Sequence, residues 1–277
     1  YEAGLQWGLT ALALAKGLPA EPALEGTVLH YTGLVLRGQG RLDEAIDHLR
    51  RALAIYEPAL GPDHPDVAGV LHNLALTLHD EGELTEAMAS ERRALEIFER
   101  ALGPRHPGIA AMLNSLGSLH RARDELSEAL ALHEQALAIA EAALGPDHRD
   151  VAFSLLDLGT VRYYRGELPE ARAAFQRALA ITERALGPEH PDVADLLINL
   201  GAVLSSQGEL EAALDHQRRA LAIKEATLGP EHLDVASALD GIGGTLERQG
   251  RHEEALASFQ RALAIDEAVL GPDHARV

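Results

Sequence analysis

The sequence has no cysteine, only two lysines and few aromatic residues, which make up 4% of its 277 positions. Without cysteine, the chain can form no disulfide and can bind neither zinc nor an iron–sulfur cluster through thiolates. The apolar stretch near its start, Leu9 to Ala15, falls far short of the roughly 20 residues that span a membrane. That stretch follows Glu2 rather than a basic segment, so it is not a signal peptide either. We therefore expect a cytoplasmic protein with no membrane partner.

The abundant residues are aliphatic and acidic. Hydrophobic residues make up 47% of the chain, which is enough to bury a core and excludes a disordered protein. The 43 Asp and Glu residues outnumber the 24 Lys and Arg residues and give a net charge of −19. Because such a surface repels phosphate groups, we expect no nucleic-acid partner, and any protein partner is expected to be basic.

One triplet, Leu-Gly-Pro, recurs along the chain at a constant spacing of 42 residues. It begins at Leu60, Leu102, Leu144, Leu186, Leu228 and Leu270. Two residues after each of these prolines comes a histidine: His64, His106, His148, His190, His232 and His274. A fixed period between 20 and 50 residues indicates a solenoid, in which similar units stack along one direction.

Each period contains two helical patterns. In the unit that begins at Pro107, a proline suited to the first helical position precedes apolar residues spaced three and four apart up to Gly117. A break at Asp124, where the other units have glycine, separates this helix from a second one over about 127–144. The pattern predicts an all-α fold of stacked antiparallel helix pairs. The repeats lie at about 23–60, 65–102, 107–144, 149–186, 191–228 and 233–270.

Small residues recur where paired helices must approach closely. Gly33 is followed by Gly40 seven residues on, by Ala45 twelve on and by Ala52 nineteen on, and the other units repeat the pattern. This spacing resembles the tetratricopeptide repeat, and the 42-residue period resembles the kinesin-light-chain subtype of that family. The resemblance implies a right-handed α-solenoid over the whole of residues 1–277. We expect residues 1–17 to form the second helix of a preceding repeat and residues 271–277 to begin another, so that the chain is part of a longer array.

The resemblance also implies an interaction module that binds an extended peptide in a concave groove, with no catalytic role. In that family the groove is lined by positions two, five, six, nine, twelve and thirteen of each first helix. The residues of this chain at those positions that we take as candidates are Asn73, Asn114, Asn199, His72, Arg121, Phe153, Leu156, Tyr163 and Ile198. An asparagine amide both donates and accepts, which suits a peptide backbone, although the same residues are equally compatible with a solvated helix face. Phe153 and Tyr163 are candidate anchors, or else pack against a neighbouring helix. None of positions two, five and six is basic, which disfavours the acidic chaperone tails that some family members bind.

The sequence indicates no catalytic, metal or cofactor site. Equivalent histidines of successive units lie at least a helix-packing distance of ~8–10 Å apart, too far to share one zinc ion. We expect them instead to pack or hydrogen-bond in the loops between units. Polar residues in the core pattern suggest a pairing of Glu91 with His120 and of His133 with Arg162. Pro58 is expected to kink or shorten its helix.

The leading interpretation is a protein-interaction scaffold, with two alternatives left open. Arginine outnumbers lysine 22 to 2, as in proteins of GC-rich bacteria, where similar arrays often follow a Ser/Thr kinase domain or another signalling domain. The chain is then the regulatory or substrate-recruiting part of a larger signalling enzyme. The second alternative is a structural array that associates end to end through uncapped apolar faces.

Overall fold

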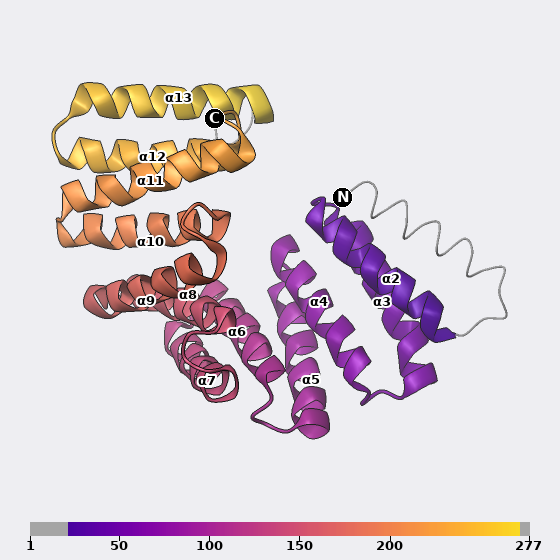
Figure 1. Cartoon of the computed structure of the whole chain (residues 1–277). Coiled ribbons are helices and arrows are strands. Elements are labelled where there is room, and N and C mark those ends of the chain that lie inside the picture. Colours follow the sequence, from indigo (N-terminus) through magenta and orange to yellow (C-terminus); the bar gives the residue numbers. More distant parts are fainter. Residues whose placement is uncertain (1–21, 272–277) are drawn as a thin grey trace. The chain divides into compact units, whose positions relative to one another are not determined.

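The computed structural model describes residues 22–271, and over this range the chain forms helices α2 to α13 and no strand (Figure 1). The first helices of the pairs are α2 (Pro22–Gly38), α4 (Pro65–Glu81), α6 (Pro107–Ala122), α8 (Arg149–Tyr164), α10 (Pro191–Gln207) and α12 (Leu233–Arg248). The second helices are α3 (Leu42–Leu60), α5 (Leu84–Leu102), α7 (Leu126–Leu144), α9 (Leu168–Leu186), α11 (Leu210–Leu228) and α13 (His252–Leu270). The predicted all-α fold of helix pairs is confirmed. The expected helix over 1–17 and most of the expected new repeat over 271–277 lie outside the described residues.

The chain divides into two compact units, an N-terminal unit Tyr1–Ala143 and a C-terminal unit Leu144–Val277. In the N-terminal unit, α2 packs on α3, α3 on α4, α4 on α5 and α5 on α6. The C-terminal unit repeats this order from α8 to α13. The second helices α3, α5, α9 and α11 therefore each lie between their own first helix and the next one.

The repeated histidines cap the first helices. His64, His106, His148, His190 and His232 each accept, at Nδ1, a hydrogen bond of 3.1–3.2 Å from the backbone N–H two residues on. This contact satisfies one of the backbone donors that a helix leaves unpaired in its first turn. The expected role in the inter-unit loops is thus confirmed for these five histidines, and its physical form is an N-cap; His274 lies outside the described residues.

Two turn residues depart from the common pattern. Asp124 takes the place of the glycine that ends the other first helices and has a φ of 62°, a left-handed conformation that aspartate tolerates better than most residues. Pro58 does not shorten α3, which runs to Leu60 and is as long, at 19 residues, as α5. The prediction of a shortened helix is wrong. Pro58 has no N–H to donate to the carbonyl oxygen of Ala54, but both residues are exposed, so that water can bind this oxygen instead.

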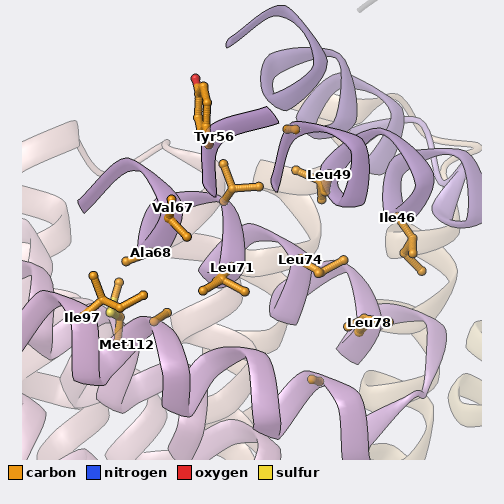
Figure 2. Close-up of a cluster of buried hydrophobic side chains, with 14 of the residues drawn as sticks. Ile46, Leu49, Tyr56, Val67, Ala68, Leu71, Leu74, Leu78, Ile97 and Met112 are labelled. Carbon is orange, nitrogen blue, oxygen red and sulfur yellow. The ribbon is translucent and has the colours of Figure 1, made fainter. Parts of the chain in front are cut away.

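A continuous hydrophobic core runs through the N-terminal unit. Figure 2 shows part of it, with Leu49 of α3, Leu71 and Leu74 of α4, and Met112 of α6 among the buried side chains. The helices approach closely where the first helix has a glycine: a Cβ added to Gly117 would lie only 2.7 Å from a ring atom of His133. Equivalent glycines lie against Leu49, Phe175, Gln217 and Phe259. The expected close approach of the paired helices is thus confirmed.

Candidate interaction surface

Neighbouring first helices within a unit are joined by side chains 43 residues apart. His30 of α2 accepts from Asn73 of α4 at 2.8 Å, and Arg37 of α2 pairs with Asp80 of α4 at 2.7 Å. In the C-terminal unit, the Tyr163 hydroxyl of α8 lies 3.3 Å from that of Ser206 of α10. Because the repeat is 42 residues long, each position contacts the next position of the following first helix.

We call the surface formed by these helices the first-helix face, defined by the six groove positions of each first helix. In the N-terminal unit it comprises α2, α4 and α6, and in the C-terminal unit α8, α10 and α12. The bridging contacts make this face continuous within each unit. It contains all nine residues that the sequence proposes for the groove.

In the N-terminal unit the first-helix face is polar, and its amides already have partners within the chain. Asn73 donates both to His30 and, at 3.0 Å, to the carbonyl oxygen of Gly69. Burial lowers the pKa of His30, which keeps its ring neutral and able to accept this bond. The Asn114 oxygen accepts from Nδ1 of His133 at 3.1 Å. Two of the three candidate asparagines thus help to hold the helices together, whatever they offer to a partner.

The same face leads into a buried polar pair. His72 donates from Nδ1 to both oxygens of Glu91, at 2.8 and 3.1 Å, and the Glu91 side chain is fully buried. The expected pairing of Glu91 with His120 is wrong, since His120 bonds to Glu125 at 2.6 Å instead. The reason is geometric: a second-helix residue at this position meets its own first helix 19 residues earlier. His133 follows the same rule with Asn114. The suggested pairing of His133 with Arg162 stays a prediction.

Burial changes the acidity of both second-helix residues. Desolvation raises the pKa of Glu91, although hydrogen bonds from His72 and Ser115 and the His72 charge oppose the shift. Desolvation, together with the positive charge of Arg121, lowers the pKa of His133 to about 4. The candidate residue Arg121 therefore influences this buried histidine.

In the C-terminal unit the first-helix face contains a pocket of about 80 Å³. Its apolar wall includes the candidates Phe153 and Leu156 of α8 together with Leu196 of α10. Phe153 is 41% exposed, and the Arg149 guanidinium lies 5.1 Å from the centre of its ring. An exposed aromatic side chain beside an apolar pocket is a typical anchor for a binding partner.

The other apolar candidates lie elsewhere on the face. Ile198 is half-buried and packs against Val193, Leu197 and Ile223, whereas Tyr163 lies at the far end of α8 beside Ser206. Asn199 donates to the carbonyl oxygen of its own helix at Asp195, at 2.9 Å. Among the candidates of the C-terminal unit, the structure therefore brings together Phe153 and Leu156 at this pocket.

Sequence reasoning missed the four polar residues that line this pocket: Arg149, Thr182, Asp192 and Asp195. Thr182 comes from the second helix α9, where we expected no groove residue. The sequence indicates Thr182 only by comparison, because several other second helices have a larger side chain at the equivalent position, for example Tyr56, Phe98 and Lys224.

Among residues 22–271, no group of three or more His, Cys, Asp or Glu side chains is arranged to hold a metal ion. Of the helices that the structure describes, none is both long enough and apolar enough to cross a membrane.

This fold and surface define a helix-pair repeat protein. The family model for the tetratricopeptide repeat matches residues 24–100, 66–142, 108–183, 150–226, 204–268 and 234–277. The chain therefore belongs to the tetratricopeptide-repeat family, whose repeats generally form protein-interaction scaffolds and are typically not catalytic. A search of curated proteins gave no match.

Solved structures similar to the chain include kinesin-light-chain-like proteins. BtubC (BKLC) from P. vanneervenii is 22% identical, with a TM-score of 0.66 over 86% of this chain and 94% of its own. A putative kinesin light chain from Podosopora anserina with nearly identical TPR-like repeats is 24% identical, with a TM-score of 0.62 over 74% of this chain and 97% of its own. The apo form of RapI is 16% identical, with a TM-score of 0.64 over 89% and 99%. The array is thus of the kinesin-light-chain-like type in its fold.

Proposed function

We propose that the chain is a scaffold that binds an extended segment of a partner protein along its first-helix face. The observation that carries this proposal is the pocket beside the exposed Phe153, which offers an apolar anchor site on a face that is continuous within its unit. The backbone of a bound segment would then run across neighbouring first helices, where polar side chains are available to it.

The test is to select binders from a random peptide display library and to measure their affinities for the chain by fluorescence anisotropy. We expect Phe153→Ala to weaken binding at least about tenfold, because a buried aromatic anchor contributes more than about 1.4 kcal/mol. The matched control is Leu256→Ala on α13, which removes a residue that is 57% exposed and lies off the first-helix face. Equal affinities for the parent chain and the Phe153→Ala variant would contradict the proposal.

A further inference from the structure

One position of the second helices meets two first helices at once. At this position Glu91 of α5 accepts a hydrogen bond of 2.8 Å from His72 of α4, 19 residues earlier, and another from Ser115 of α6, 24 residues later. A polar side chain at this position is therefore held from both sides, by the first helix of its own repeat and by the first helix of the next repeat.

Gln217 of α11 occupies the same position without either of these partners. The residue 19 positions earlier is Ile198, which has an apolar side chain, and the residue 24 positions later is Gly241, which has none. Only 7% of Gln217 is exposed, and its buried Oε1 accepts no hydrogen bond from the residues that the structure describes. Because a buried polar atom without a partner is costly, this amide points to a ligand from outside the chain.

The end of the Gln217 side chain lies at an opening in the first-helix face. Helix α11 packs on both α10 and α12, which also contact each other (Figure 1). The Gln217 stem packs against Gly201 of α10, where an added Cβ would lie 2.8 Å from Cγ of the glutamine. The amide nitrogen lies instead 3.7 Å from the Cβ that Gly241 of α12 would have, and Gly241 is exposed. A side chain at Gly241 would therefore contact the amide, whereas glycine leaves the amide open to the face.

The groove positions around this opening have small residues. Gly241 is at position six of α12 and Gly244 is at position nine, where an added Cβ would meet no atom within 4 Å. Helix α10 has Ala202 at its own position nine. An extended chain can therefore approach these helices closely, because no large side chain at these positions keeps it away.

We propose that Gln217 binds the main chain of the partner segment at Gly241. A carboxamide has both N–H donors and an oxygen acceptor, and in an extended chain the N–H and C=O groups of one residue point to the same side. The last bond of a glutamine side chain turns easily, so that both ends of the amide can reach the opening. The amide then donates from Nε2 to a backbone carbonyl oxygen of the partner and accepts at Oε1 from a backbone N–H. This inference rests on the proposed function, since it names the groups of the partner that are bound at one point of the first-helix face.

The test uses a defined probe, the peptide acetyl-Ser-Ala-Ser-Ala-Ser-dimethylamide, and a counterpart in which every backbone nitrogen is methylated. The counterpart keeps the carbonyl groups but has no backbone N–H. Nuclear magnetic resonance follows the side-chain amide signals of Gln217 and the backbone amide signal of Gly241 in the full chain. The probe is expected to shift these signals at concentrations up to about 20 mM, since a contact of this size corresponds to millimolar affinity. The methylated peptide is expected to bind at least about fivefold more weakly, because Oε1 then has no donor.

Two exchanges between repeats are the matched variants. Gly241→Ser introduces the residue found at Ser115, which gives the amide a partner within the chain, and is expected to abolish the shift of the Gln217 signals. Gln217→Leu introduces the residue found at Leu49, which packs on the equivalent Gly33, and is expected to abolish the shift of the Gly241 signal. The control is Gly69→Ser on α4, where an added Cβ has open space, and it is expected to change neither shift. If Gln217→Leu does not fold, Gly241→Ser keeps the proposal testable.

No shift with the probe would mean that water alone satisfies the Gln217 amide, and it would overturn the inference. Equal binding of the methylated peptide, or an unchanged shift in the Gly241→Ser variant, would overturn it as well. The proposed function is judged separately, by the peptides selected from the library. If these bind and depend on Phe153 while the Gln217 signals do not respond, only the further inference fails.

Discussion

At one position of the second helices, the side chain that packs on the small residue of the first helix differs widely from repeat to repeat. The series is Leu49, Glu91, His133, Phe175, Gln217 and Phe259. Glu91 and His133 are fully buried, and each is hydrogen-bonded to the residue 19 positions earlier, His72 or Asn114. In the next repeat, the same two positions are Leu156 and Phe175. The repeat therefore accepts either an apolar or a hydrogen-bonded pair at this point, and the choice affects stability.

The buried histidine makes stability depend on pH. The pKa of His133 is about 4 in the folded chain, against about 6.5 for an exposed histidine, so between these values the unfolded chain binds a proton that the folded chain does not. Its contribution is therefore lost as the pH falls, by about 2 kcal/mol at pH 5 relative to pH 7. Glu91 acts in the opposite direction, because its raised pKa makes the folded chain bind a proton first as the pH falls.

A double variant isolates the effect of His133. Asn114→Leu with His133→Phe copies the apolar pair of the next repeat and removes the titrating group while Glu91 stays in place. We expect urea unfolding to show that the variant gains about 2 kcal/mol over the parent chain between pH 7 and pH 5. His252→Gln, at an exposed histidine, is the control. Parallel pH profiles for the parent and the double variant would refute this assignment.

Glu91 allows a second test by exchange between repeats. Glu91→Leu introduces the residue that the preceding repeat has at Leu49, and it removes a buried carboxylate while the exposed edge of His72 remains open to water. We expect it to stabilise the chain at pH 7 by about 1 kcal/mol. Glu91→Ala leaves a cavity in addition and is expected to cost about 2–3 kcal/mol. Thermal unfolding distinguishes them, and a Leu variant less stable than the Ala variant would contradict the argument.

At the scale of the helices, the loop histidines determine where five of the first helices begin. His190 accepts from the backbone N–H of Asp192 at 3.2 Å, and α10 starts at the intervening Pro191. His190→Ala is expected to destabilise the chain by about 1 kcal/mol, and His190→Asn, which can also cap, by much less. Urea unfolding together with amide hydrogen exchange in the first turn of α10 measures this. Equal losses for the two variants would mean that the histidine acts through packing rather than as a cap.

For the whole molecule, the sequence predicted the framework far better than the contacts between side chains. The 42-residue period and the spacing of small residues were sufficient for an all-α fold of helix pairs, because close helix packing admits few side chains at those positions. His72, the partner of Glu91, was missed because we expected contacts between neighbouring repeats. The hydrogen bond instead joins the two helices of one repeat. The shortening expected from Pro58 was wrong because this effect depends on exposure, which a periodic pattern does not reveal.

The candidate site was predictable only in part. Phe153 and Leu156 could be proposed from their positions in the first helix, and the structure places both at one pocket. The pocket itself depends on Thr182, on a helix where no groove residue was expected, and on the absence of a larger side chain. A single small residue carries little information unless it is compared with its counterparts in the other repeats, such as Tyr56 and Lys224.

The second helices carry different side chains at the position of Thr182, namely Tyr56, Phe98, Ala140, Lys224 and Asp266. At Thr182 the side chain is short and lines the pocket beside Phe153. In an array of this kind one position can vary while the caps and the helix pairs recur, so that a new surface requires no new framework.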